Sequence, residues 1–458
     1  MLVKMFLEEG LGNSSYLIGS PEAGIAAVVD PIRDVEPYLE AAQELGLRIA
    51  YALETHSHND FISGCRELAA RTGAEVGASA GAGLQFPHRP LADGDEIDLG
   101  GFRLRVLETP GHTPEHISFL AVDEEGQPQA LFSGGALLVG SVARTDLLGE
   151  DQSEGLARAL FHTLREKVLP LPEAVALYPT HGGGSFCTTV SAPRERSSTI
   201  GRERERNPFL RFTAEEEFVR FALSDLPPMP AFFGRPRPIN VRGPKVLGGL
   251  PVLPALSPQE VYERSGQVLV LDVRPAAAFD DGHIPGAHSI PLEASFILWA
   301  AWLLPGDAHL LLVADHQEET VSALRGLIKV GYDEYEGFLE GGMKAWRGAE
   351  LPLARVARLT AADLARALAE GESWAILDVR HPYEWEAGHI RGALHIPLGE
   401  LPQRLDAVPR ERPLAVHCAS GFRAGVAAGI LEAQGFRSVY HVIDGFEGLR
   451  KAGLPIAT

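Results

Sequence analysis

The sequence predicts a multidomain α/β protein, and three features lead to this prediction. The chain has 458 residues, which corresponds to about three domains at roughly 100–200 residues per domain. Short apolar runs alternate with amphipathic helical stretches, a pattern typical of parallel sheets covered on both faces. The second half of the chain contains an internal repeat, so two domains of one kind are expected there.

The composition is that of a globular protein, with 45% hydrophobic and 22% charged residues. A formal net charge of −20 repels phosphate groups, so we expect no nucleic-acid partner and no binding to an anionic membrane. No run of 18 apolar residues occurs, and residues 1–18 lack the pattern of a secretory signal. Three cysteines are too few for a disulfide framework, and we therefore expect a cytoplasmic protein.

The first 245 or so residues alternate between strand-like and helix-like stretches. Strands are predicted at residues 26–29, 49–53, 103–109, 117–122 and 174–178, and helices at 35–45 and 64–72. Residues 197–206 are charged and predicted to form an exposed helix. Residues 226–238 are rich in proline, which favours an extended connector.

Histidines follow three of the strand-like runs. His56, His58 and Asp60 come after the run 49–53, while His112 and His181 lie in two further loops shaped by glycine and proline. Side chains that follow buried strands project into a crevice where α/β folds bind ligands. Imidazole and carboxylate together suit zinc, iron or manganese, so these loops predict a metal site.

The segment Thr55-His56-Ser57-His58-Asn59-Asp60-Phe61 resembles the T-H-x-H-x-D-H motif of the metallo-β-lactamase superfamily. Residues 11–16, 110–116 and 143–146 are similar to the persulfide dioxygenase branch of that superfamily. The resemblance implies an αβ/βα sandwich and one iron(II) held by His56, His112 and an aspartate. It also implies that Arg144 lies near the carboxylate of a thiol substrate, although an ordinary ion pair is an equal alternative.

Two positions depart from the family pattern. Gly135 stands where the resemblance places the aspartate ligand, and Phe61 replaces the last histidine of the motif. We therefore expect iron(II) to bind weakly or not at all, with zinc as an alternative occupant, and a dinuclear hydrolase is disfavoured. His58, Asp60 and His181 are expected to orient the ligands or to serve as alternative ligands, and Cys187 to be a buried structural thiol.

The internal repeat is visible in two short motifs. Leu-Asp-Val-Arg at 271–274 and Gly-His-Ile-Pro-Gly-Ala at 282–287 recur 106 positions later, with one change in the second motif. Further matches at residues 342, 351 and 352 recur 103 positions later, so the first copy carries a small insertion. Each copy is predicted to be an α/β domain of about 100 residues.

The second copy contains a cysteine loop between an apolar strand, residues 414–417, and a helix. The loop reads Cys418-Ala419-Ser420-Gly421-Phe422-Arg423. A thiol at a helix N-terminus faces unpaired N–H groups, and these groups, together with the Arg423 charge, favour the thiolate. The small residues allow the loop to curl into an anion-binding nest.

This loop and the motif around Asp378, Arg380, Glu384 and His389 resemble the rhodanese family of sulfurtransferases. The resemblance implies that Cys418 is a nucleophile that carries a persulfide within the loop 418–423. Asp378, Arg380, Glu384 and His389 are then expected to hold the fold. The first copy also resembles a rhodanese, but Asp315 occupies the cysteine position, so we expect that copy to be inactive.

The predicted organisation is a metallo-β-lactamase-like domain at 1–240, a linker at 241–256, an inactive rhodanese at 257–353 and an active rhodanese at 358–458. The function implied is sulfide detoxification, in which a thiol persulfide is oxidised to sulfite and Cys418 exchanges sulfur between persulfide, sulfite and thiosulfate. The alternatives are that the N-terminal domain only binds persulfide, or that it hydrolyses thioesters like glyoxalase II. The oligomeric state stays open, with a homodimer as the assembly considered.

Overall fold

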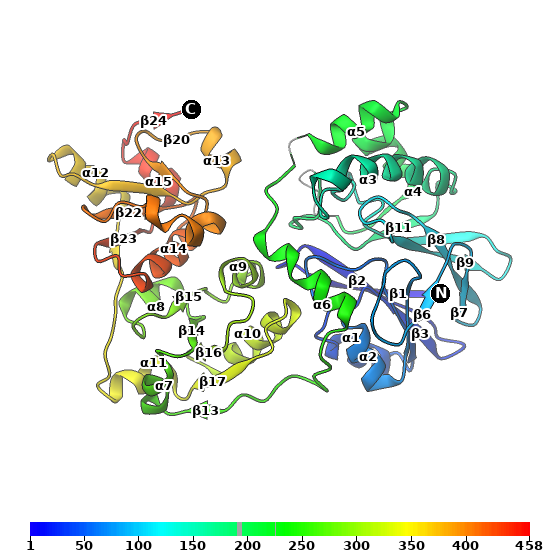
Figure 1. Cartoon of the computed structure of the whole chain (residues 1–458), viewed down its shortest axis with the longest axis horizontal. Coiled ribbons are helices and arrows are strands. Elements are labelled where there is room, and N and C mark those ends of the chain that lie inside the picture. Colours follow the sequence, from blue (N-terminus) through cyan, green and yellow to red (C-terminus); the bar gives the residue numbers. More distant parts are fainter. Residues whose placement is uncertain (190–194, 225) are drawn as a thin grey trace. The chain divides into compact units, whose positions relative to one another are not determined.

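The computed structural model describes residues 1–189, 195–224 and 226–458 of the chain (Figure 1). Contacts divide the chain into two compact units, Met1–Pro251 with Ile328–Gly331, and Val252–Leu327 with Tyr332–Thr458. These are called unit 1 and unit 2 below. The histidine loops lie in unit 1, whereas both copies of the repeat lie in unit 2.

Unit 1 contains two six-stranded sheets. The first sheet has the order β1-β2-β3-β4-β5-β6 and the second β12-β11-β10-β9-β8-β7. The strands of the first sheet are β1 (Leu2–Glu8), β2 (Asn13–Ser20), β3 (Ile25–Val29), β4 (Arg48–Leu53), β5 (Glu75–Ser79) and β6 (Arg89–Leu91). Those of the second are β7 (Glu96–Asp98), β8 (Phe102–Glu108), β9 (Ile117–Asp123), β10 (Pro128–Gly134), β11 (Ala176–Pro179) and β12 (Ser198–Thr199).

The hydrophobic clusters show how the layers stack. One cluster joins the facing sides of the two sheets, with Tyr16 and Leu53 from the first and Phe119 and Phe132 from the second. A second cluster packs the first sheet against α1 (Glu36–Glu44) and α2 (Cys65–Thr72). A third packs the second sheet against α3 (Glu150–Thr163), α4 (Ile200–Arg206) and α5 (Glu215–Leu223). The order helix, sheet, sheet, helix is the predicted αβ/βα sandwich.

The proline-rich segment after α5 differs from its prediction as an extended connector. It contains a 3₁₀ turn, Ala231–Gly234, and a short helix, α6 (Pro236–Arg242). Pro236 occupies the first turn of α6, where the missing N–H of proline would have no intrahelical partner in any case. The prolines of this segment are therefore compatible with the start of a helix, and the segment is not an extended chain.

Unit 2 contains two five-stranded sheets with the same strand arrangement, in which all pairs are parallel. The first copy has the order β13-β17-β16-β14-β15 and the second β18-β23-β22-β19-β21. The strands of the first are β13 (Ala255–Leu256), β14 (Leu269–Asp272), β15 (His288–Ser289), β16 (Leu310–Val313) and β17 (Tyr335–Leu339). Those of the second are β18 (Ala357–Leu359), β19 (Ala375–Asp378), β21 (Leu394–His395), β22 (Leu414–His417) and β23 (Val439–Val442), beside a short pair β20 (His389–Ile390) and β24 (Ile456–Ala457).

Helices flank both sheets. The first copy has α7 (Pro258–Arg264), α8 (Ala276–Asp281), α9 (Phe296–Leu303), α10 (Gln317–Lys329) and α11 (Gly342–Gly348). The second has α12 (Ala361–Ala369), α13 (Pro382–Glu386), α14 (Phe422–Ala433) and α15 (Gly445–Lys451).

The repeated Asp-Val-Arg motif has the same buried geometry in both copies. The Arg274 guanidinium donates to the Asp272 carboxylate and to the carbonyl of Gly282. In the second copy, Arg380 binds Asp378 and the carbonyl of Gly388 in the same way. The motif therefore connects the end of a central strand to the following loop, a structural role.

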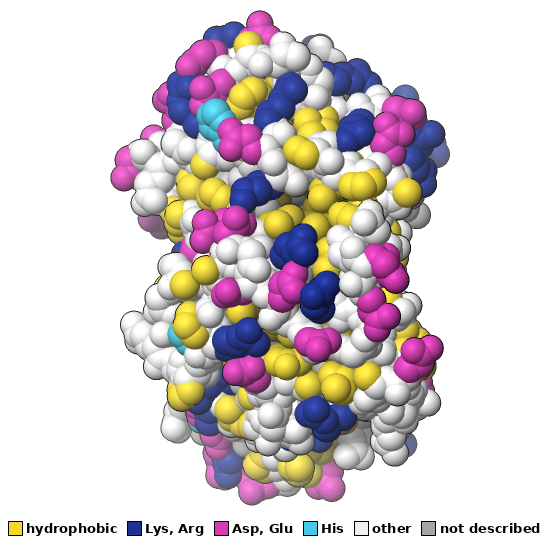
Figure 2. All heavy atoms as spheres, turned by 90° about the vertical axis from the view of Figure 1, so that its right-hand side faces the viewer, with side chains coloured by type: hydrophobic (Ala, Val, Ile, Leu, Met, Phe, Trp, Pro, Cys, Tyr) yellow, Lys and Arg dark blue, Asp and Glu magenta, His cyan; other side chains and the backbone are white. Residues whose placement is uncertain are grey.

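Charged side chains of both signs are interspersed on the face shown in Figure 2, and among the described residues there the basic side chains form no continuous patch. Within the described part of the chain, no helix combines the length and the apolar character needed to cross a bilayer.

Candidate functional site

The cysteine loop of unit 2 joins the end of β22 to the start of α14. The Cys418 side chain is buried, and the backbone N–H of Gly421 points at it, with 3.1 Å between that nitrogen and Sγ. Gly421 has a φ of +108°, which a residue with a Cβ adopts only with strain. Glycine at position 421 therefore lets the loop turn this amide toward the sulfur.

A second loop braces the cysteine loop from behind. The N–H of Phe446 donates to the carbonyl of Cys418 at 2.8 Å. A Cβ on the preceding residue, Gly445, would lie 2.0 Å from the carbonyl oxygen of Ala419, so only glycine allows this approach. Ala419 and Ser420 are exposed at the rim of the loop.

Arg423, in the first turn of α14, forms a two-pronged ion pair with Glu384 of α13, at 2.6 and 2.9 Å. Burial opposes the charge on Arg423, but Glu384 and the nearby Cys418 raise the pKa of the guanidinium. Arg423 therefore stays positive beside the cysteine loop, and Glu384 fixes its position.

In the corresponding loop of the first copy, a carboxylate of the same chain binds the backbone amides. The backbone N–H groups of Asp315 and His316 both donate to Oε2 of Glu319, at 3.0 and 3.1 Å. The amides that would otherwise face an anion are thus occupied by a carboxylate, and Asp315 is exposed. This loop therefore has no cysteine to hold a sulfur atom, and two of its amides already bind a carboxylate.

In unit 1, the three histidine loops converge. His56 follows β4, His112 follows β8 and His181 follows β11, and all three side chains are buried. Each offers one ring nitrogen within 4.8 Å of the other two, so the three residues could hold a metal ion.

Hydrogen bonds at Nδ1 determine which nitrogen of each ring is free. Thr55 donates its only hydroxyl proton to Asp30, so it accepts from Nδ1 of His56 at 2.9 Å. Nδ1 of His112 donates to the carbonyl of Arg144 at 2.7 Å. Nδ1 of His181 faces the side-chain oxygen of Asn13 at 3.1 Å.

The Nε2 atoms of the three rings face one another. Nε2 of His112 has no hydrogen-bond partner among the described residues, and the Nε2 atoms of His56 and His181 lie 3.4 Å apart. Burial and neighbouring imidazoles lower the pKa of His56 and of His112 well below the usual value, so both rings are neutral. Three imidazoles whose Nε2 atoms converge are a donor set that fits zinc, and the set lacks the carboxylate of a two-histidine iron(II) site.

Gly135 lies directly against this cluster. A Cβ on Gly135 would be 2.5 Å from Cδ2 and 2.8 Å from Cγ of His112, so the imidazole occupies the space of a side chain at that position. The N–H of Gly135 donates to Nε2 of His116 at 2.8 Å, which keeps His116 out of the cluster. An aspartate ligand at position 135 is therefore incompatible with the present place of His112.

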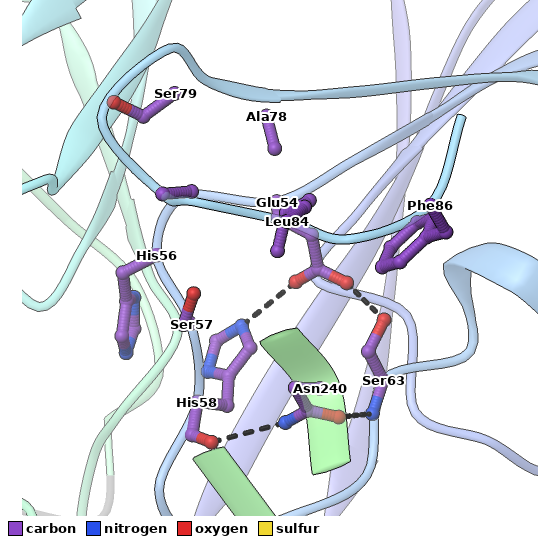
Figure 3. A pocket seen from close by; sticks show the side chains of 11 residues that line it. Glu54, His56, Ser57, His58, Ser63, Ala78, Ser79, Leu84, Phe86 and Asn240 are labelled. Carbon is purple, nitrogen blue, oxygen red and sulfur yellow. Dashed lines mark hydrogen bonds and ion pairs between the residues drawn. The ribbon is translucent and has the colours of Figure 1, made fainter. Parts of the chain in front are cut away.

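His58 points away from the cluster, toward two carboxylates. Its Nε2 lies 3.1 Å from Glu54, as Figure 3 shows, and 3.2 Å from Asp30. Burial opposes the charge, but these carboxylates raise the pKa of His58 to about 10. Phe61 stacks on the His58 ring with the ring centroids 4.1 Å apart. His58 is thus part of a buried ion cluster in this structure.

Asp60 and Cys187 lie on the far side of His181. Oδ2 of Asp60 lies 3.4 Å from Nδ1 of His181 and accepts hydrogen bonds from Asn13 and from the Cys187 thiol, at 2.8 and 3.6 Å. Burial raises the pKa of Cys187 well above its usual value, so this group is a thiol. A carboxylate in contact with Nδ1 of a metal-ligating histidine orients that ring, which is the role this position supports for Asp60.

Arg144 is fully engaged inside unit 1. Its guanidinium binds both oxygens of Asp146, at 2.6 and 2.7 Å, and the carbonyl of Phe186 at 3.1 Å. A substrate carboxylate would have to compete with Asp146 for this group.

Sequence reasoning missed the clamp that α6 forms on the histidine motif. The Asn240 side chain donates to the carbonyls of His58 and Phe61 and accepts from the N–H of Ser63 (Figure 3). Arg237, one turn earlier, donates to the carbonyl of Ser57. No local pattern reveals these contacts, because they join residues about 180 positions apart.

Comparisons with known proteins match residues of both units. The family profile of the metallo-beta-lactamase superfamily matches residues 9–181, and that of the rhodanese-like domain matches residues 257–349 and 360–452. The persulfide dioxygenase ETHE1 of Homo sapiens is 32% identical over 246 residues, 53% of this chain and 88% of that protein. A hydroxyacylglutathione hydrolase of Methylococcus capsulatus is also 32% identical, over 48% of this chain and 91% of that protein. Among solved structures, a metallo-beta-lactamase of Staphylococcus aureus superposes with a TM-score of 0.66 and 33% identity, over 74% of this chain and 98% of that one.

Proposed function

Since the chain belongs to the metallo-beta-lactamase superfamily and carries two rhodanese-like domains, we propose that it is a sulfur-transfer enzyme in which Cys418 carries a persulfide. Its place in sulfur metabolism rests on the combination of these domains. The observation that carries the assignment to Cys418 is the Gly421 N–H aimed at the sulfur from the start of α14.

The transfer takes place in two balanced steps. The Cys418 thiolate attacks the outer sulfur of thiosulfate, a new S–S bond forms, and sulfite leaves with the electron pair of the broken S–S bond. An acceptor thiolate then attacks the outer sulfur of the persulfide, which releases the Cys418 thiolate. The Gly421 amide and the Arg423 charge stabilise the negative charge on the Cys418 side of both steps.

Unit 1 would act on the same class of compound through the His56, His112 and His181 cluster. The proposed reaction converts a thiol persulfide, O2 and water to the thiol, sulfite and two protons, with the electrons lost by the outer sulfur gained by O2. Bound iron(II) would supply this redox chemistry, whereas bound zinc would supply Lewis-acid chemistry for hydrolysis. At their Nδ1 atoms, Thr55 holds His56, the Arg144 carbonyl holds His112, and Asn13 and Asp60 hold His181.

Thioester hydrolysis is the second candidate for unit 1. The absence of a carboxylate from the three-imidazole cluster favours it, and the hydroxyacylglutathione hydrolase relative has the same 32% identity as the persulfide dioxygenase, over a smaller share of this chain. Protein loaded with iron(II) and protein loaded with zinc are to be assayed for O2 uptake with a thiol persulfide and for hydrolysis of a glutathione thioester. O2 uptake by the iron form supports persulfide oxidation, and hydrolysis by the zinc form supports thioester hydrolysis. If neither activity is found, unit 1 is a binding module.

The sulfur transfer is tested by steady-state turnover from thiosulfate to cyanide. We expect Cys418→Ser to abolish turnover, because serine cannot form the persulfide. Cys65→Ser, which changes a buried thiol in α2 of unit 1, is the matched control and should retain the wild-type rate. Unchanged turnover of Cys418→Ser would overturn the assignment.

A further inference from the structure

The helix that begins at the cysteine loop packs closely on the first, silent repeat. A Cβ on Gly425 of α14 would lie 2.9 Å from the Cβ of Ala276 at the start of α8. One turn further along α14, a Cβ on Gly429 would lie 3.2 Å from the ring of Phe279. Small residues one turn apart thus let the two helices approach closely, so the silent repeat supports the helix that carries the reactive loop.

A buried histidine bridges the two repeats at the start of this helix. Nδ1 of His441, on β23, lies 2.8 Å from Oδ2 of Asp280 on α8. Nε2 of the same ring lies 2.9 Å from the carbonyl oxygen of Gly421. His441 and Asp280 are both almost completely buried, at 4% and 2% exposure.

Both ring nitrogens of His441 have a partner. A backbone carbonyl accepts hydrogen bonds only, so Nε2 of His441 donates to Gly421. The Asp280 carboxyl group pairs with Nδ1 and thereby fixes the orientation of the ring and the nitrogen that faces the loop.

The residue held by His441 is the one that faces the sulfur. Gly421 accepts from His441 through its carbonyl and donates through its N–H to Sγ of Cys418. Because Gly421 has an unusual φ of +108°, an anchor on its carbonyl limits the rotation that would turn its N–H away. A continuous path of hydrogen bonds thus runs from Asp280 through His441 and Gly421 to Cys418.

We propose that Asp280 of the silent repeat is a positioning residue for Cys418, acting through His441 and the Gly421 backbone. The repeat without a cysteine is then a working part of the sulfur-transfer site. This inference rests on the proposed sulfur transfer at Cys418. Asp280 does not touch the substrate; it fixes the donor that does face the reacting sulfur.

The test compares Asp280→Asn with Asp281→Asn in the full-length chain. Asp281 is the neighbouring residue on α8, but it is exposed and binds Arg358 at the surface, so its substitution is a matched control. We expect Asp280→Asn to lower kcat for thiosulfate turnover about tenfold, the effect of weakening one charge-assisted hydrogen bond. Asp281→Asn should stay within about twofold of wild type.

A second readout is the rate at which iodoacetamide alkylates Cys418, measured against pH without any sulfur donor. Burial raises the pKa of Cys65 and of Cys187 well above the usual value, so these thiols react slowly. Asp280→Asn should slow the alkylation of Cys418 and move its pH midpoint upward, because the ring that anchors Gly421 is no longer held and the Gly421 N–H then stabilises the thiolate less. The other ionisable groups around the loop stay unchanged in both variants: His417, Tyr383, Glu384 and Arg423.

The outcomes separate the inference from the function on which it rests. Wild-type turnover and wild-type alkylation in Asp280→Asn would overturn the inference while leaving the sulfur transfer intact. Absence of turnover in the wild type would contradict the proposed function, and the alkylation rates would still decide the role of Asp280. If Asp280→Asn does not fold, His441→Gln keeps an amide donor but loses the imidazole that pairs with Asp280. A slowed alkylation of Cys418 in this variant supports the inference, and a wild-type rate overturns it.

Discussion

The Nε2 atoms of His56 and His181 lie 3.4 Å apart in the interior of unit 1, and the Nδ1 atom of each ring is held by a neighbouring side chain. Nε2 of His112 points to the same place and has no hydrogen-bond partner among the described residues. This convergence of three ring nitrogens is the physical basis for expecting a metal ion here.

Replacing His181 by alanine should therefore remove metal from unit 1. We expect the affinity for the metal to fall at least about tenfold. The metal content per chain after dialysis, measured by inductively coupled plasma mass spectrometry, should fall accordingly. The control is His162→Ala, which changes an exposed histidine on α3 and should leave the metal content unchanged. Equal metal content in His181→Ala and wild type would show that the ion lies elsewhere.

Adding a single methyl group at Gly135 should disturb the same site. In Gly135→Ala the new Cβ would lie 2.5 Å from the His112 ring, which Arg144 holds by its carbonyl, so we expect a loss of about 1–3 kcal/mol of stability and weaker metal binding. Gly135→Asp carries the same Cβ, and we therefore expect it not to restore an iron(II) site. Calorimetry and metal analysis measure both effects.

The control for that substitution is Gly155→Ala. Gly155 lies within α3, and a Cβ there meets nothing within 4 Å, so the exchange should stabilise the helix by about 0.5–1 kcal/mol. If Gly135→Ala were as stable as Gly155→Ala, His112 would have room to move, and a Cβ at position 135 would not be crowded by its ring.

Acid should destabilise unit 2 through His417. Burial lowers the pKa of this ring to about 4, although Asp378 attracts a proton to it. The unfolded chain takes up the proton near pH 6.5, so the stabilisation is complete above that pH and is lost as the pH falls through about 4. The full effect is about 3 kcal/mol.

Tryptophan fluorescence can measure this effect, because all five tryptophans of the chain lie in unit 2. Urea unfolding at pH 7.5 and pH 4.5 should show a larger loss of stability for wild type than for His417→Phe, which has no titrating group at that position. An equal loss in the two proteins would mean that His417 does not titrate on unfolding in this range.

Local patterns predicted most of the architecture. Short apolar runs such as 49–53 and 414–417 became strands because burial on two faces demands continuous apolar residues, and glycine and proline marked the loops that follow. The repeat revealed two domains with one topology, because a recurring sequence motif recurs in structure, as the Asp272–Arg274 and Asp378–Arg380 pairs show.

The contacts that complete both sites were not predictable in this way. Asn240 clamps the histidine motif from a helix about 180 residues away, and Asp280 reaches His441 across 161 positions. Such contacts depend on how the folded helices and strands pack against one another, and a single sequence carries no local signal for them. The crowding of Gly135 by His112 is likewise a property of packing, which the residue type alone could not show.

The most direct test of the account is the mass of the peptide that contains Cys418 after incubation with thiosulfate. Peptide mass spectrometry should show a gain of one sulfur atom on that peptide, removed by cyanide or by a thiol, and no gain on the peptides of Cys65 and Cys187. A Cys418 peptide that stays unmodified, or a sulfur atom found on another cysteine, would contradict sulfur transfer at the start of α14.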